Sequence, residues 1–143
     1  YGPTADNTPA GYNVLNGFIR TALAGGDLEL FAPGTQRRDY LHVSDVVHAF
    51  LLSGVHAAAI GQAFNIGSGV GTPIGEAARL VVRIAGSGRV VERPWPAAWK
   101  AVETGDFVFD IAKARTWLGW SPKVGLEEGI AATVQAMRVG TRG

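Results

Sequence analysis

The chain has 143 residues, of which 47% are hydrophobic and 17% charged, and its formal net charge at pH 7 is +1. This length suffices for one compact domain with a core, and the composition is that of an ordinary globular chain rather than a disordered one. The near-neutral charge gives no indication of a nucleic-acid or anionic-membrane partner, no apolar run approaches the ~20 residues of a membrane span, and the absence of cysteine excludes disulfides and thiolate chemistry.

The first part of the chain predicts a loop, a helix and a strand. Residues 1–11 are rich in Gly, Pro, Asn and Thr, as loops are. Apolar side chains recur at helical spacing over residues 14–23, and the two glycines that follow predict the end of that helix. Residues 28–31 then predict a short strand, which a proline–glycine turn closes.

The middle of the chain predicts two strands, each followed by a helix. Residues 40–43 are strand-like, and Ser44 is expected to cap the next helix. The apolar run at 63–66, which precedes a Gly-Ser-Gly turn, predicts a buried strand. Thr72, followed by a proline, predicts the start of a helix that Gly86 ends.

The last part predicts one more strand and two helices. Residues 89–92 are a strand candidate, and 93–99, with two prolines and two tryptophans, predict an ordered loop. Asp110 is expected to cap a short helix, and the apolar spacing over 126–137 predicts a last helix before a frayed tail that holds Arg138 and Arg142.

Five helices and about four short strands in mixed order predict an α/β fold with the character of a small α+β lobe. We expect one domain over residues 1–143. A complete doubly wound sheet is excluded, because the chain has no long run of alternating strands and helices.

The segment Gln36-Arg37-Arg38-Asp39-Tyr40-Leu41-His42-Val43-Ser44-Asp45-Val46-Val47 carries the most chemical information. It places a guanidinium and a phenol near the start of a strand that runs into a capped helix. An arginine there suits bidentate pairing with a phosphate. The alternative is a structural ion pair between Arg38 and Asp39.

This segment fits the pattern Q-x-R-D-[FY]-x-[HY]-V-x-D-V and so resembles the extended short-chain dehydrogenase/reductases, in particular the NAD-dependent sugar-nucleotide epimerases and dehydratases. Further matches follow in the family's order: Tyr1-Gly2-Pro3, residues 14–19 and 28–31, Phe64-Asn65-Ile66-Gly67-Ser68-Gly69, Gly105-Asp106, and residues 110–114, 118–124 and 126–129. The resemblance covers nearly the whole chain and implies the carboxy-terminal, substrate-binding portion of such an enzyme.

The resemblance implies roles for several residues by position. Arg38 stands where the family's arginine binds the substrate diphosphate, and Tyr40 beside it is expected to help order that site. Phe31, Val14 and Leu15 stand where residues contact the nucleotide base.

Two further positions carry the family's pattern less directly. Asp106 lies near the acidic residue that receives the ribose hydroxyls, and Arg93 is the arginine of an Arg-Pro pair. The commonest family form reads R-P-G-D, whereas here Arg93-Pro94 is separated from Gly105-Asp106. We expect both residues at the substrate but with altered geometry.

Two parts of the family's machinery are not found in this sequence. The glycine-rich strand-to-helix turn that holds NAD is absent, since Gly67-Ser68-Gly69 lacks the third glycine and the βαβ context. No tyrosine has a lysine four residues later to act as the proton-transfer pair. We therefore expect no catalytic residue and no cofactor site in this chain, with NAD belonging to a full-length parent, in which Tyr1-Gly2-Pro3 would lie beside it.

Other residues suggest packing rather than chemistry. His42, His48 and His56 lack the spacing of metal ligands on one helical face, so we expect no metal site. The four tryptophans are expected to pack in the core and in a lid.

The resemblance implies a nucleoside diphosphate sugar, UDP- or dTDP-linked, as the ligand. A strand at 63–66 that would join a missing cofactor domain leaves an edge unpaired, which predicts a homodimer or strand exchange. Three functions remain open: one lobe of an epimerase or dehydratase, a binding module without turnover, and a vestigial or rearranged fragment that acts as an interaction protein. No secretion signal is visible after Tyr1, so we expect a cytoplasmic setting without membrane or nucleic-acid partners.

Overall fold

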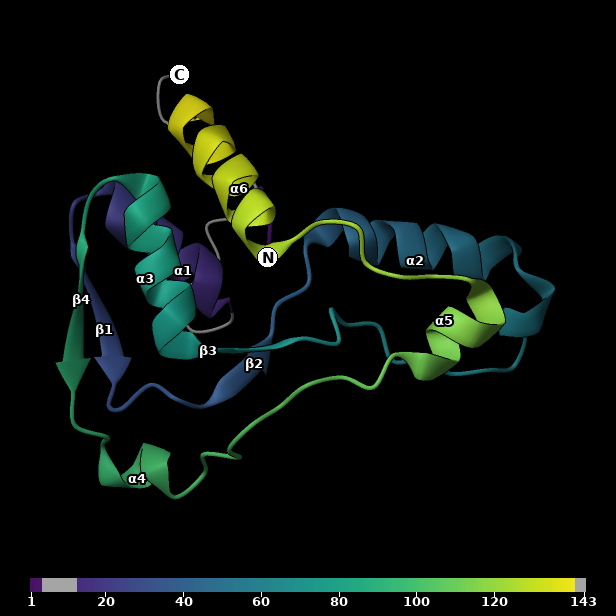
Figure 1. The fold of residues 1–143 in the computed structure, drawn as a ribbon, viewed down its shortest axis with the longest axis horizontal. Coiled ribbons are helices and arrows are strands. Elements are labelled where there is room, and N and C mark those ends of the chain that lie inside the picture. Colours follow the sequence, from purple (N-terminus) through teal and green to yellow (C-terminus); the bar gives the residue numbers. More distant parts are fainter. Residues whose placement is uncertain (4–12, 141–143) are drawn as a thin grey trace.

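The computed structural model describes residues 1–3 and 13–140, and it divides into a larger and a smaller part (Figure 1). The chain-order elements are α1 (Val14–Leu23), β1 (Asp27–Phe31), β2 (Arg37–Asp39), α2 (Val43–Val55), η1 (Ala57–Ala59), β3 (Gly71–Pro73), α3 (Ile74–Ala85), β4 (Arg89–Arg93), α4 (Ala97–Lys100), α5 (Ala112–Leu118) and α6 (Leu126–Gly140). The loop predicted over 4–11 and the end of the tail lie outside the described residues.

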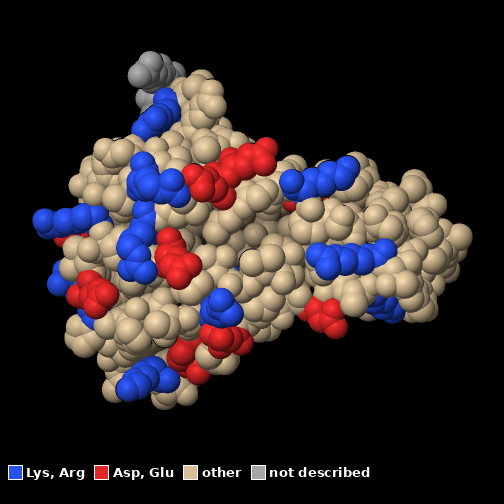
Figure 2. Space-filling model, in the orientation of Figure 1, with Lys and Arg blue, Asp and Glu red and all other residues tan. Residues whose placement is uncertain are grey.

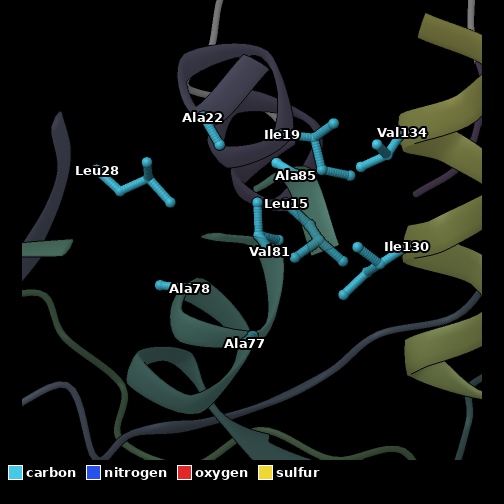
Figure 3. Packing of buried hydrophobic residues seen from close by; sticks show 10 residues of the cluster. All are labelled: Leu15, Ile19, Ala22, Leu28, Ala77, Ala78, Val81, Ala85, Ile130 and Val134. Atoms are coloured by element: carbon cyan, nitrogen blue, oxygen red, sulfur yellow. The ribbon is translucent and has the colours of Figure 1, made fainter. Parts of the chain in front are cut away.

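The larger part is built from α1, α3 and α6 and from the parallel pair β1–β4 (Figure 1). Its core gathers small and branched side chains from all three helices and from β1 (Figure 3): Leu15, Ile19, Ala22, Leu28, Ala77, Ala78, Val81, Ala85, Ile130 and Val134. The alanines of α1 and α3 leave space for the two helices to approach closely, which fits their extensive mutual contact. The strands β1 and β4 pack against this core.

The smaller part consists of α2, η1 and α5, at the right of Figure 1. A second cluster holds it together, and its buried members are Ala49, Ile111, Ala114, Leu118 and Trp120. It is separate from the core of the larger part. Two of the connections between the parts run through β2 and β3, which pair antiparallel with Arg38 opposite Thr72.

The strand before α2 lies earlier than its apolar pattern predicts. β2 covers Arg37–Asp39, whereas 40–43 forms no strand, because its partner β3 ends at Pro73 opposite Arg37 and at Gly71 opposite Asp39. The predicted run 40–43 is therefore wrong by three residues. Polar residues form this strand because its position depends on hydrogen-bonded pairing with β3 rather than on apolar sequence.

Three helix starts also differ from the prediction. The N-cap of α5 is Ile111 rather than Asp110, although Asp110 Oδ1 accepts a hydrogen bond from the Ala112 N–H at 2.8 Å. His42, not Ser44, is the N-cap of α2, and its Nδ1 accepts a hydrogen bond from the Ser44 N–H at 3.3 Å. α3 begins after Pro73, with no side-chain cap, because Thr72 is held in β3 opposite Arg38. The predicted glycine ending of α3 is confirmed, since Gly86 adopts a left-handed φ of 67°.

Residues 63–66 form no strand in the structure, contrary to the prediction. The described part of the chain offers them no neighbouring strand, and without a ladder partner an apolar run is not a strand. The alternation remains, because Phe64 and Ile66 pack on the second cluster while Ala63 and Asn65 are exposed. The segment has the pattern of a strand without its sheet.

The α2 face of the smaller part presents an apolar surface. Residues 46–75 contain no Asp, Glu, Lys or Arg. On α2 the side chains of Phe50 and Leu51 are 72% and 68% exposed, and Val47 and Val55 are exposed as well. Figure 2 shows the outer end of this part, at the right, almost free of charged side chains, whereas charges of both signs cover the larger part.

The carboxy-terminal region is more ordered than the sequence predicts. The loop predicted over 93–99 contains the start of α4, and Arg138 lies in α6, where it donates a hydrogen bond to the Ala85 carbonyl at 2.6 Å. Among the described residues, no helix has the length and apolarity needed to cross a membrane.

Candidate functional site

A cavity of about 310 Å³ opens on the larger part, where the end of β1 meets α4. Segments distant in sequence meet there: the start of α1, β1, β2, the start of α3 and the stretch that carries α4. Its lining residues are Val14, Phe18, Glu29, Leu30, Phe31, Gln36, Arg38, Ile74, Trp95, Trp99, Val102 and Glu103. Three of the seven predicted site residues, Val14, Phe31 and Arg38, are therefore brought together.

One wall of this cavity is aromatic. The ring of Phe31 lies 4.8 Å from that of Trp95, tilted by 38°, and 5.7 Å from that of Trp99, edge to face. Phe31 ends β1, and Trp99 comes from α4, where 61% of it remains exposed. Exposed ring faces beside a cavity suit stacking on another planar ring, such as a nucleobase.

Arg38 brings its guanidinium group to the same cavity. Its Nη2 donates to Glu103 Oε1 at 2.5 Å, and its Nη1 donates to the carbonyls of Gly105 at 2.5 Å and Arg37 at 3.0 Å. Pairing of β2 with β3 fixes its backbone. The guanidinium is thus held by two segments 65 or more residues apart. Such a fixed guanidinium suits binding of a phosphate.

The predicted alternative of an Arg38–Asp39 ion pair is wrong. The carboxylate of Asp39 accepts hydrogen bonds from three backbone amides instead: Ser68 at 2.6 Å, Gly69 at 3.0 Å and Phe109 at 3.2 Å. Successive residues of a strand point to opposite faces, so the two side chains diverge. Asp39 organises the loop after residue 66, and Arg38 faces the cavity.

Asp106 and Arg93 lie outside the cavity lining. Asp106 Oδ1 accepts a hydrogen bond from the backbone N–H of Arg37 at 2.7 Å, so this carboxylate anchors its segment to β2. Arg93, at the end of β4, donates its Nε to Glu29 at 3.2 Å. Both side chains are engaged with the protein beside the cavity rather than within it.

Leu15 is not brought to the cavity either. Its side chain is 1% exposed and packs in the main core, because it points inward from α1 while the neighbouring Val14 lies at the cavity. The apolar pair was assigned from position alone, and helix geometry separates its members.

Tyr40 lines a different cavity, of about 300 Å³, between the loop at Ser68 and residues 122–126. Its phenol Oη is buried and has no hydrogen-bond partner in the described part of the chain. Burial raises the pKa of Tyr40 to about 12, and the Arg38 charge opposes this shift. Tyr40 therefore stays neutral and does not share the Arg38 cavity.

The Gly67-Ser68-Gly69 loop does not fit a dinucleotide phosphate. Its amides at Ser68 and Gly69 already donate to Asp39, and the chain continues into β3 rather than into a helix N-terminus. Tyr1-Gly2-Pro3 lies against the main core: the Asn16 side chain accepts from the Gly2 N–H and donates to the Gly2 carbonyl.

Sequence reasoning missed Glu103, Trp95 and Trp99 as site residues. The tryptophans were expected only to pack, and Trp120 does so in the second cluster, but Trp95 and Trp99 face Phe31 at the cavity. A run of two prolines and two tryptophans at 94–99 was the available signal. Glu103 had none, because its role depends on a contact with Arg38 across the fold. In the residues that the structure covers, no group of three potential metal ligands occurs.

Comparison with known proteins gives a consistent picture. The model of the NAD dependent epimerase/dehydratase family matches residues 1–67. The UDP-glucose 4-epimerase of Mycolicibacterium smegmatis is 40% identical over 142 residues, which are 96% of this chain and 42% of that protein.

Solved structures match as well. The crystal structure of UDP-glucose 4-epimerase with UDP-glucose from Thermotoga maritima has a TM-score of 0.82 and 34% identity, over 99% of this chain and 44% of that one. The structure of MoeE5 in complex with UDP-glucose and NAD has a TM-score of 0.79 and 26% identity, over 99% of this chain and 45% of that one. The chain thus spans less than half the length of these relatives.

Proposed function

The chain belongs to the NAD dependent epimerase/dehydratase family, and from this premise we propose that it is the substrate-binding portion of such an enzyme. Its ligand is a nucleoside diphosphate sugar, with the base on the Phe31 wall and the diphosphate at Arg38. The portion corresponds to the carboxy-terminal lobe and does not turn over substrate alone, because NAD and the proton-transfer residues belong to the rest of the parent protein.

One observation carries this proposal: the cavity joins an aromatic wall and a fixed guanidinium. A nucleoside diphosphate has the matching parts, a planar base and, one ribose away, an anionic diphosphate. Solved relatives contain UDP-glucose, which supports the ligand class. UDP- and dTDP-linked sugars are the candidates, since Val14, Phe18 and Ile74 complete an apolar base pocket.

The test is a calorimetric titration of the 143-residue chain with UDP, dTDP and GDP. We expect one diphosphate to bind saturably and Arg38→Ala to weaken that binding about tenfold or more, the cost of a lost charged hydrogen bond. Arg37→Ala is the matched control, because it removes a neighbouring positive charge whose side chain does not line the cavity. Absence of binding by all three diphosphates would favour a folded interaction fragment instead.

We also propose that a second copy of the chain covers the apolar face of α2, through a homodimer or an exchanged strand. A cavity of about 340 Å³ between α2 and residues 59–66 has no charged residue in its lining. Residues 63–66 beside it keep a strand's alternation but lack a partner. Apolar surface and an unpaired segment together favour association of chains.

A further inference from the structure

The anion-binding residue of the proposed site is already paired. Arg38 and Glu103 form a salt bridge of 2.5 Å, with side chains 27% and 23% exposed, and both line the cavity beside Phe31. Within the site, the guanidinium charge is therefore neutralised by a carboxylate of the same chain.

We propose that Glu103 competes with the ligand's phosphates for Arg38, so that ligand entry releases Glu103. This inference rests on the proposed function of the cavity. A diphosphate and the Glu103 carboxylate are both anions, and at hydrogen-bonding distance from one guanidinium they repel each other. The two cannot both pair with Arg38 at low cost, and the Glu103 carboxylate, which lies on an exposed segment, is the partner that can move into solvent.

Arg38 keeps its position when Glu103 leaves. Its Nη1 donates to the carbonyl of Arg37, on its own strand, and β2 pairs with β3 and with Phe107 independently of Glu103. The guanidinium can therefore bind a phosphate without a change in the backbone of β2.

The segment that carries Glu103 loses little when the pair opens. The Glu103 carboxylate contacts Arg38 and the N–H of Gly105 at 3.0 Å, while Ala101, Val102 and Thr104 are exposed. Its ends are fixed elsewhere: Asp106 holds it to β2, and α4 precedes it. A short exposed loop with firm ends suits a displaceable side chain.

The competition makes Glu103 a determinant of specificity. The phosphate groups of a ligand form charged hydrogen bonds with Arg38 that offset the cost of displacing the Glu103 carboxylate. An uncharged ligand with the same base forms no such bonds with Arg38. The Arg38–Glu103 pair therefore lowers the affinity of the cavity for nucleosides and weak anions relative to its affinity for nucleoside diphosphates.

The experiment compares UDP affinity in the wild-type chain, Glu103→Gln and Glu92→Gln by calorimetry. Glutamine keeps the shape and the bond to Gly105 but removes the competing charge. We expect Glu103→Gln to bind UDP about fivefold more tightly, the factor for ~1 kcal/mol of a salt bridge, and uridine with unchanged affinity. Glu92, exposed on β4 and outside the cavity, controls for net charge.

Each other outcome has a separate meaning. Wild-type binding with equal or weaker binding by Glu103→Gln would overturn the competition and leave the proposed function standing. An equal gain in Glu92→Gln, or an equal gain for uridine, would also overturn it, because the effect would not concern the phosphates. Absence of UDP binding by the wild type and by Glu103→Gln would overturn the proposed function and this inference together.

Discussion

At the scale of residues, the side chains of Arg38 and Asp39, which are neighbours on β2, point in opposite directions and make different contacts. Arg38 faces the cavity and holds a carboxylate from residue 103, while Asp39 faces the other way and gathers three backbone amides. The sequence places both in one motif, which suggested that they pair with each other. Alternation along a strand separates them, so Arg38 faces the cavity where we propose that the ligand binds, and Asp39 holds the loop after residue 66.

Asp39→Ala should destabilise the chain by about 2 kcal/mol or more, because three amides lose a charged acceptor. Asp110→Ala is the matched control, since the Asp110 carboxylate accepts one such bond, from Ala112 at 2.8 Å, and should cost about 1 kcal/mol. Chemical denaturation of both variants measures the difference. Equal losses would mean that the three Asp39 contacts stabilise the fold no more than one such hydrogen bond.

His42 should make stability depend on pH. Burial lowers the pKa of His42 below its usual 6.5, the charge of the Tyr1 amino group adds to this shift, and Asp45 and Glu128 oppose it. The unfolded chain then takes up a proton more readily than the folded one, so the free energy of unfolding falls as pH drops below about 6.5. Denaturation between pH 7.5 and 5.5 should show the loss.

The variant His42→Asn should flatten part of this pH dependence, because it removes the buried imidazole and keeps a capping side chain. His56→Asn is the control, since His56 also caps a helical turn through its Nδ1. A pH profile that is the same in His42→Asn and in the wild type would rule out His42 as the source.

At the scale of elements, the sequence predicts the longer helices and the strands β1 and β4, but it misplaces β2 and misses β3. α1, α3 and α6 follow from apolar spacing, and the ends of α1 and α3 follow from glycines; both are local properties of the chain. β2 has a polar sequence and exists because β3 lies beside it. The run 63–66 has an ideal apolar sequence and forms no strand, because its partner is lacking in the described residues.

The same distinction applies to the candidate site. Phe31 and Arg38 were found because their elements carry a recognisable motif. Glu103 and Trp99 were missed because they reach the cavity through a contact of segments 65 or more residues apart, which no local pattern records. Leu15 was misplaced for the converse reason, since adjacency in sequence says nothing about which side of α1 faces the cavity.

The exposed face of α2 should drive self-association of the 143-residue chain. We expect it to sediment as a dimer, and Phe50→Glu to shift it to a monomer, because a buried charge in an apolar contact is costly. Val139→Glu is the control, since Val139 is an exposed apolar residue on α6, 69% accessible, away from that face. A wild-type chain that stays monomeric at high concentration would contradict the proposed interface.

At the scale of the whole molecule, the two hydrophobic clusters differ in size and lie in different parts of the chain. The larger part has a full core of three helices behind β1 and β4 (Figure 3), and the proposed site lies beside that core, where β1, β2 and the stretch that carries α4 meet. The smaller part has five buried core residues and an exposed apolar face on α2. Ligand binding is therefore expected of the first part, and association with another polypeptide of the second.

The central claim is that the cavity beside Phe31 binds a nucleoside diphosphate, and the four tryptophans allow a direct test. Trp95 and Trp99 stand at the cavity, whereas Trp117 and Trp120 belong to the smaller part, so their indole N–H signals report on the two parts separately. In an NMR titration with UDP, the account predicts saturable shifts of the Trp95 and Trp99 signals, assigned with Trp99→Phe, while Trp117 and Trp120 stay unchanged. Shifts confined to Trp117 and Trp120, or no shift at saturating UDP, would contradict it.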